Sequence, residues 1–193
     1  LPIYVLQQYF DPQRTIASQE TVAQFIEREI EEGLKRHPMI WTEAYQEALD
    51  LRELTQMLTD FLEFEVERLA HASFKPCRVE YAFGEEDTPP LEIKGEGQKI
   101  RLRGRVDRID TDAEKKFAVV TDYKRSYKFK AANLELGTAL QLPLYLLAAQ
   151  KHLGLTPLGA EIYSIRDHKR TGFYCEEVAK VFGKEFSSRA YLP

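Results

Sequence analysis

The sequence predicts an α/β domain in which a mixed β-sheet is flanked by helices, with a helical region at its N-terminus. Three observations predict this fold class. Apolar residues recur at helical spacing through the first third of the chain, and the composition becomes β-type after Pro76. A further helical stretch then separates the early strands from the later ones.

Two helices are expected before Pro76. The first covers residues 18–36, where Ser18 can cap the helix. The second covers residues 42–71. His37-Pro38 separates them, because the residue before a proline disfavours the helical conformation. The apolar positions at helical spacing are Val22, Phe25, Ile26 and Ile30 in the first helix, and Leu51, Leu54, Leu58, Leu62 and Val66 in the second.

Three strands are expected next, at residues 78–83, 99–110 and 117–124. The polar run 84–90 is predicted to be a turn or loop. The polar segment 111–116 joins the last two strands, which indicates a β-hairpin.

The remaining elements are a helix, two strands and a last helix. The helix covers residues 136–152 and ends at Gly154, in the position that a left-handed C-cap favours. Strands follow at residues 158–165 and 172–175, and residues 176–190 are predicted to be helical.

The length of 193 residues fits one structural domain, with a helical region at 1–75 packed on a core at 76–193. Because the chain begins with Leu1 rather than Met, we expect it to be a piece of a longer protein. No apolar run approaches the roughly 20 residues of a membrane-spanning helix. Two cysteines make no disulfide framework, so we expect a reduced, intracellular setting in the cytoplasm.

The charge is unevenly distributed along the chain. The net charge is −4, but residues 1–70 hold 14 acidic and 6 basic side chains, a balance of −8, which leaves +4 on residues 71–193. Polyphosphate affinity depends on local clusters of cations more than on the total. An acidic average therefore does not exclude nucleic acid as a ligand.

Residues 117–124 place two chemically useful side chains on one face. Side chains alternate along a strand, so Asp122 and Lys124 project together while Tyr123 points the other way. The hairpin partner brings Asp107 toward them. Taken alone, an Asp-x-Lys at a strand end is more often a solvated ion pair than a metal site, and Asp107 could instead pair with the neighbouring Arg105 or Arg108.

Two carboxylates and an ammonium suit phosphodiester hydrolysis. Magnesium prefers a few carboxylate oxygens together with waters and substrate oxygens. Asp107 and Asp122 can supply the carboxylates, and the main-chain carbonyl of Tyr123 a third ligand. Lys124 can orient or deprotonate the attacking water, or neutralise developing charge. A cation beside two acids keeps its proton, which favours the electrostatic role over a base.

Three ordered motifs resemble the RecB-like branch of the PD-(D/E)XK nucleases, the AddB/RecB type of nuclease domain. They are GRVDRID, VVTDYKRS and QLPLY, within residues 76–150. The matching positions are Gly104, Asp107, Asp122, Tyr123, Lys124, Gln141 and Tyr145. The resemblance implies a restriction-endonuclease-like fold and a deoxyribonuclease that uses Mg²⁺ or Mn²⁺.

The resemblance also implies the roles of individual residues. Asp107 and Asp122 would bind the metal, and Lys124 would be catalytic. Gln141 and Tyr145 would lie beside the site, on one helix face because they are four residues apart. Without the resemblance, this pair is more typical of a polar stripe on a leucine-rich helix.

Two further metal ligands are considered. Glu80 sits where relatives often carry an acid on the first core strand, and could hold a second metal or bond a basic side chain. Relatives usually have an upstream Gly-x-x-x-His; Gly33 and His37 have that spacing, but Pro38 interrupts the helix, which favours His37 as a surface residue. Some relatives bind an iron–sulfur cluster through four cysteines, which this chain cannot supply.

Basic and aromatic residues flank the predicted metal site. Such clusters can hold phosphates while rings stack on unpaired bases, which favours single-stranded DNA over a merely solvated face. The predicted DNA-binding residues are Arg103, Arg105, Arg108, Arg125, Tyr127, Lys128 and Lys130. The leading hypothesis is an exonuclease that acts with a helicase domain or subunit in recombination or repair.

Two other hypotheses remain open. The first is a nuclease fold with weak or no activity, kept for DNA binding or subunit assembly, because the upstream His is in question. The second is a protein-docking surface on the acidic helical region 18–72, which is compatible with either.

Overall fold

The structure is a computed structural model that describes residues 21–38, 43–85, 88–95, 97–126, 132–133, 136–137, 139–176 and 190–192. The chain divides into two compact units. The helical unit comprises Leu1–Ala70 with Ile165–His168, and the sheet unit comprises His71–Ser164 with Lys169–Pro193. Among the helices of the described residues, none combines the length and the apolar character needed to cross a membrane.

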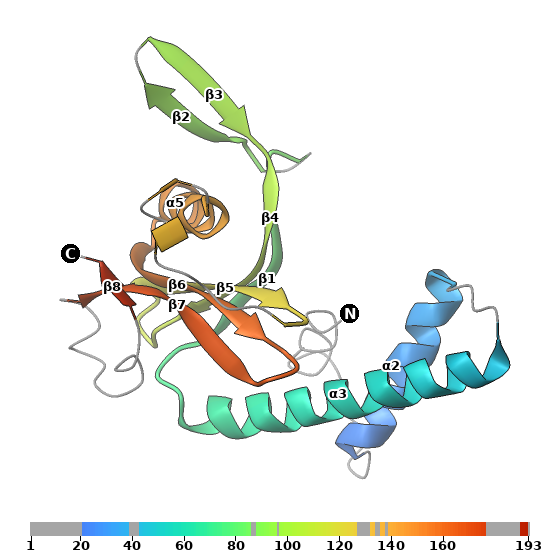
Figure 1. Cartoon of the computed structure of the whole chain (residues 1–193). Helices are drawn as coiled ribbons and strands as arrows, with labels where there is room; N and C mark the ends of the chain where they lie inside the picture. The colour runs from blue at the N-terminus through green and yellow to red at the C-terminus, as the bar shows by residue number, and fades with distance from the viewer. Residues whose placement is uncertain are drawn as a thin grey trace. The chain divides into compact units, whose positions relative to one another are not determined.

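The helical unit contains α2 (Val22–Arg36) and α3 (Ala44–His71), drawn in blue and cyan in Figure 1. Thr21 caps α2 in a reciprocal capping box with Gln24, so the cap is not the predicted Ser18, which lies outside the described residues. On α3, only two residues of the predicted apolar stripe, Leu58 and Leu62, are buried. Leu51, Leu54 and Val66 are half-buried.

The sheet unit is built on a mixed six-stranded sheet, as predicted for the fold class. Its order is β1-β4-β5-β6-β7-β8, with β5–β6 and β7–β8 parallel and the other neighbours antiparallel. The strands are β1 (Lys75–Phe83), β4 (Gly104–Thr111), β5 (Phe117–Lys124), β6 (Thr156–Ser164), β7 (Lys169–Cys175) and β8 (Ala190–Leu192). The predicted hairpin of β4 and β5 is confirmed.

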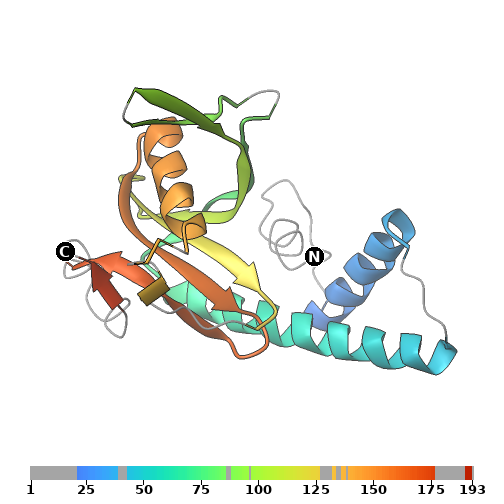
Figure 2. The same ribbon diagram turned by 45° about the horizontal axis from the view of Figure 1, so that its top comes forward.

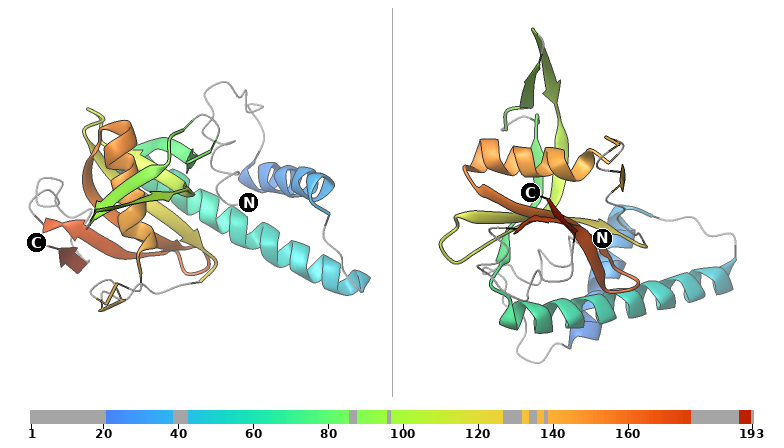
Figure 3. Two further views of the ribbon diagram at one scale, coloured as in Figure 1. Left: turned by 90° about the horizontal axis from the view of Figure 1, so that it is seen from above. Right: turned by 60° about the vertical axis from the view of Figure 1, so that its left-hand side comes forward.

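Helix α5 (Gln141–Leu153) covers one face of this sheet, as the two views of Figure 3 show. Its apolar residues Leu142 and Leu146 pack in one buried cluster with Ile109 and Val120 of the central strands. Burying a leucine side chain stabilises a fold by about 1.5–3 kcal/mol, so this cluster fixes where α5 begins over the sheet. Gly154 ends the helix with φ 68°, as predicted.

The predicted start of α5 was wrong by five residues. The prediction placed residues 136–140 in the helix, whereas the structure begins it at Gln141. Leu136 and Gly137 form a turn instead, with φ 67° at Gly137. A left-handed residue cannot continue a right-handed helix. The turn makes Gln141 the first helical residue.

A two-stranded ribbon, β2 (Leu91–Gly95) and β3 (Gln98–Leu102), extends from the sheet unit beyond α5 (Figures 1 and 2). The sequence predicted a single strand over 99–110 and no strand at 91–95. In the structure that single strand is divided at Arg103, between β3 and β4. The ribbon is anchored by buried Leu91, and Lys151 Nζ of α5 donates to the carbonyl of Glu92 at 2.6 Å.

The C-terminal helix predicted at 176–190 falls mostly on residues 177–189, outside the described residues. Its last residue was assigned wrongly, because Ala190 begins β8, which pairs with β7 in parallel.

Candidate active site

The end of β5 brings a carboxylate and an ammonium together on the face that α5 covers. Asp122 is buried, and its Oδ2 lies 2.7 Å from Nζ of Lys124, whose side chain is 41% exposed. The two residues are separated by one position, so strand alternation places them on the same face. A partly exposed ammonium beside a buried carboxylate leaves this strand end accessible to a ligand.

Asp107 of β4 completes the pair of carboxylates. Its Oδ2 accepts a hydrogen bond from the backbone N–H of Tyr123 at 2.7 Å. Burial raises the pKa of Asp107 to about 6, the bond from Tyr123 opposes that rise, and the charge of Asp122 adds to it. The structure thus gathers Asp107 and Asp122 in one electrostatic environment.

Gln141 and Tyr145 join the same site from the first turn of α5. Gln141 Nε2 donates to Asp122 Oδ1 at 2.9 Å and to Tyr145 Oη at 2.9 Å. Burial raises the pKa of the Tyr145 phenol, which therefore stays protonated. The pair is a polar stripe on an apolar helix, and that stripe faces the carboxylate.

Lys124 keeps its proton in this arrangement. Burial acts to lower the pKa of Lys124, but the contact with Asp122 and the charges of Asp122 and Asp107 outweigh it, so the net direction is upward. The ammonium is therefore a fixed positive charge here.

The charge on this face is unbalanced. Asp107, Asp122, Lys124 and Gln141, together called the active-site face, carry two carboxylates and one ammonium. In the part of the chain that the structure describes, Oδ2 of Asp122 accepts no hydrogen bond of regular geometry beyond its ion pair. Among those residues, no group of three or more acidic, His or Cys side chains is placed to hold one metal ion. Two carboxylates, one of which has an oxygen held only by an ion pair, fit an open magnesium-type site and not a closed zinc cage.

Glu80 of β1 lies close enough to Asp107 for its charge to contribute to the raised pKa of that carboxyl. Its φ of 50° is left-handed, an unusual conformation for this residue type. Its carboxylate pairs with Arg105 at 3.4 Å, and Arg105 also contacts Glu85 at 3.2 Å. Glu80 thus bonds a basic side chain, one of the two predicted possibilities, beside the carboxylate pair.

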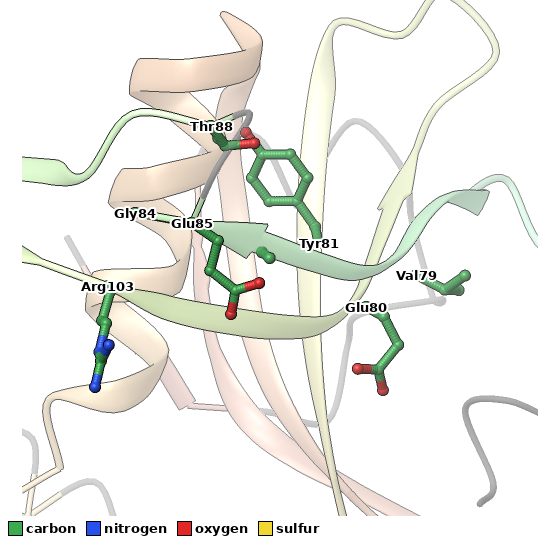
Figure 4. A pocket seen from close by; sticks show the side chains of 8 residues that line it. Val79, Glu80, Tyr81, Gly84, Glu85, Thr88 and Arg103 are labelled. Carbon is green, nitrogen blue, oxygen red and sulfur yellow. The ribbon is translucent and has the colours of Figure 1, made fainter.

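A surface pocket of about 950 Å³ adjoins this region. Its lining includes Glu80, Tyr81, Glu85, Thr88 and Arg103. Figure 4 shows the side chains of Glu80, Glu85 and Arg103 on one side of the strands and Tyr81 on the other. The pocket therefore combines two carboxylates with a guanidinium.

The other predicted site residues are distributed differently. Arg103, Arg105 and Arg125 are exposed. His37 caps the end of α2 in the helical unit, whereas the active-site face belongs to the sheet unit. Tyr127, Lys128 and Lys130 lie outside the described residues.

Arg108 was predicted to bind DNA, but its position in the fold does not fit that role. Its side chain is 0% exposed, so DNA cannot reach it in this structure. The guanidinium donates through Nε and Nη2 to the carboxylate of Asp110, and through Nη1 to Tyr123 Oη at 2.8 Å. This prediction was wrong because the cation is neutralised inside the fold.

A second buried ion pair lies on β6 and β7. Glu161 accepts hydrogen bonds from Arg170 and Tyr174, and from Thr121 Oγ1 at 3.0 Å. The Arg170 guanidinium lies 4.8 Å from the ring centroid of Tyr163, which is 5.6 Å from that of Tyr123.

These two clusters form the back-face network: Arg108, Asp110, Thr121, Tyr123, Glu161, Tyr163, Arg170 and Tyr174. The sequence pattern alone does not indicate this network as a unit. One signal was present, since Arg108 and Asp110 are two apart in a strand and so share a face.

Comparison with known proteins adds a family. Residues 4–190 match the model of the PD-(D/E)XK nuclease superfamily. The match covers β1 to β7, the first residue of β8 and all of the active-site face.

Relatives include subunits of the ATP-dependent helicase/deoxyribonuclease of several bacteria. The chain is 33% identical over 132 residues to the protein of Clostridium novyi (strain NT), which covers 66% of the chain and 11% of that protein. It is 39% identical over 103 residues to that of Moorella thermoacetica, covering 51% and 9%. The protein of Alkaliphilus oremlandii is 32% identical over 139 residues, covering 65% and 12%. The chain thus spans only a small part of these relatives.

Proposed function

The chain belongs to the PD-(D/E)XK nuclease superfamily, and from that premise we propose that residues 76–193 carry a deoxyribonuclease core that uses Mg²⁺ or Mn²⁺. The observation that carries the proposal is that Asp107, in the middle of β4, shares one electrostatic environment with Asp122 and Lys124 at the end of β5. Gln141 is bonded to Asp122.

Asp107 and Asp122 would hold the metal, with the main-chain carbonyl of Tyr123 as a third ligand. Support comes from the excess carboxylate charge and from the Asp122 oxygen that has an ion pair but no regular hydrogen bond. Glu80 is a further candidate ligand, because its charge contributes to the raised pKa of Asp107. A divalent ion bound there would supply a Lewis acid for the phosphate and a water of lowered pKa.

Lys124 would stabilise charge rather than accept a proton. Its pKa is raised above the usual lysine value, so it remains an ammonium at neutral pH and faces the position where a phosphate would gain negative charge. Gln141 would fix the orientation of Asp122 through Nε2, and Tyr145 would fix Gln141. These side chains lie on a strand and a helix, which hold them rigidly.

The DNA path would follow the basic residues beside the site. Arg103 and Arg125 are exposed near the ends of β4 and β5, and Arg105 is exposed but paired with two acids. The charged face of the ribbon adds Lys94, Lys99 and Arg101. We favour a single strand, because Tyr127 among Lys128 and Lys130 offers a ring for base stacking in the sequence.

A helicase is the proposed partner. The relatives carry both helicase and deoxyribonuclease in their names, and the chain matches only 9–12% of the length of the three described above. We infer that the domain acts as an exonuclease in recombination or repair, beside a helicase domain or subunit.

Cleavage of end-labelled DNA tests the proposal. Single- and double-stranded oligonucleotides are incubated with Mn²⁺ and with Mg²⁺, using wild type and Asp122→Ala, and EDTA as a metal-free control. We expect cleavage by wild type only, with shorter products from the labelled single strand. Equal cleavage by Asp122→Ala or in EDTA would contradict the proposal.

The second candidate is a nuclease fold used for DNA binding or assembly. The absence of a third clustered metal-binding side chain among the described residues favours it. Salt-sensitive DNA binding without cleavage under any divalent metal, in a protein extended at its N-terminus, would support this candidate. Cleavage by that protein would exclude it.

A further inference from the structure

Tyr123 lies between Asp122 and Lys124 on β5 and is held at two atoms by consecutive residues of β4. Its backbone N–H donates to Oδ2 of Asp107 at 2.7 Å. Its hydroxyl accepts from Nη1 of Arg108 at 2.8 Å. Asp107 and Arg108 therefore hold the same residue, one through the main chain and the other through the side chain.

Arg108 is itself firmly placed. Its side chain is fully buried, and two further nitrogens of the guanidinium are bonded to the Asp110 carboxylate. A bidentate pair of this kind fixes the plane of the guanidinium as well as its position. The direction of the third bond, to the Tyr123 hydroxyl, is thus set by the fold before any ligand binds.

Because Arg108 has a fixed position, its hydrogen bond to Tyr123 also restrains the main chain that carries the active-site face. Tyr123 is 8% exposed, and its side chain lies opposite those of Asp122 and Lys124 because strand side chains alternate. Movement of the ring would shift the main chain between these two residues and the N–H that orients Asp107. The buried side chain of Tyr123 can in this way determine the orientation of the Asp107 and Asp122 carboxylates without contacting them.

We propose that Arg108 and Tyr123 are positioning residues of the metal site, and that their bond holds Asp107 toward Asp122. Partners that orient metal ligands change metal affinity by about 10–100-fold when removed. The inference rests on the proposed function for its cleavage readout, but its metal-binding readout is independent of cleavage.

Tyr123→Phe removes only the hydroxyl that Arg108 contacts. Tyr174→Phe is the matched control, since Tyr174 is also buried, also bonds a charged group of the back-face network, and is separated from β5 by β6. Both variants should lose some thermal stability. If Tyr123 positions the metal ligands, only Tyr123→Phe should also weaken Mn²⁺ binding.

Mn²⁺ binding is titrated calorimetrically for wild type and both variants, below their unfolding temperatures. We expect the Mn²⁺ dissociation constant to rise about 10–100-fold in Tyr123→Phe and to stay within about twofold of wild type in Tyr174→Phe. Amide hydrogen exchange at residue 123 should also quicken in Tyr123→Phe and not in Tyr174→Phe. Cleavage by Tyr123→Phe should recover at saturating Mn²⁺.

Equal Mn²⁺ affinity in wild type and Tyr123→Phe would overturn the inference, as would an equal loss in both variants. If wild type binds Mn²⁺ but does not cleave DNA, while Tyr123→Phe alone binds weakly, the positioning role stands and the proposed nuclease function fails. If wild type cleaves and Tyr123→Phe matches it at every Mn²⁺ concentration, the function stands and the positioning role fails.

Discussion

The two faces of the sheet carry charged residues but use them differently. On the active-site face, Asp107 and Asp122 share one partly exposed cation, Lys124. On the back-face network, Arg108 is paired with Asp110, and Glu161 with Arg170. The first face has an excess of negative charge, whereas the second has equal numbers of the two signs.

This difference separates function from stability. A buried cation with a bidentate carboxylate partner is already neutralised and needs no ligand. The back-face pairs therefore serve to connect the strands and keep the sheet rigid. Two carboxylates with a single cation are incomplete without another positive charge. The comparison predicts that substitutions on the active-site face reduce activity. Substitutions of the back-face ion pairs should reduce stability, and within that network only the contact between Arg108 and Tyr123 should also affect the metal site.

The largest expected effect is that of Asp122→Asn on cleavage. The amide keeps an acceptor for Gln141 but removes a metal-binding charge, so we expect kcat/KM to fall by about a thousandfold or more, several kcal/mol in the barrier. The unfolding temperature without metal should be unchanged or higher, because repulsion with Asp107 is relieved. Initial cleavage rates and thermal denaturation of the same preparation provide the check. If Asp122→Asn loses activity only because it unfolds at a lower temperature, the predicted difference between the two faces is contradicted.

Lys124→Met should have the next largest effect on cleavage. The substitution keeps the packing of the stem but removes the ammonium, and one lost transition-state contact costs about 100–1,000-fold in kcat. Because a cation beside the carboxylates is removed, Mn²⁺ binding should be as tight or tighter. Single-turnover cleavage and Mn²⁺ titration measure the two quantities. Weaker Mn²⁺ binding would indicate that Lys124 organises the carboxylates instead.

Glu161→Gln tests the back-face network. It leaves Arg170 largely buried beside a neutral amide, and breaking a buried pair in this way costs about 3–5 kcal/mol. The free energy of unfolding, measured in urea, should fall by that order, while the Mn²⁺ dependence of cleavage stays as in wild type. A change in metal dependence at full folding would show that the back-face ion pair of Glu161 also serves the active-site face.

The smallest effect concerns pH. Burial raises the pKa of Asp107 from 3.8 to about 6, so protons compete with the metal below that value. Mn²⁺ affinity should fall by up to about tenfold per pH unit below 6, if one proton is displaced. Calorimetric titrations in matched buffers at several pH values measure this.

The metal-free protein should respond in the opposite direction. The folded state holds the Asp107 proton more tightly than the unfolded state, so it binds more protons between about pH 4 and 6. The contribution of Asp107 to the free energy of unfolding therefore increases as the pH falls from above 6 toward 4. Asp107→Asn should abolish that dependence, and an unchanged profile in the variant would assign it to other groups.

The sequence predicted those parts of the molecule that depend on local alternation. Asp122 and Lys124 lie two apart on a strand, and Asp107 lies on its hairpin partner, so the pattern places them without knowledge of the rest of the fold. Burial of Arg108 depends on what surrounds it in three dimensions, which the pattern does not contain. A basic residue in a basic strand was therefore predicted to contact DNA, although it is neutralised by Asp110.

The boundaries of elements were less predictable for a similar reason. The short strand β2 is held by its pairing with β3 and by Lys151 of α5, and neither contact can be read from its five residues. The late start of α5 depends on the left-handed backbone of Gly137. Glycine permits that conformation but does not require it.

The central claim is that Asp107 and Asp122 share one divalent ion. Crystals grown with Mn²⁺ and measured at a wavelength where manganese scatters anomalously locate the ion directly. We predict a single strong peak about 2.1 Å from a carboxylate oxygen of each aspartate, and none beside the paired charges of the back-face network. A peak bound to only one aspartate, or located away from both, would contradict the account.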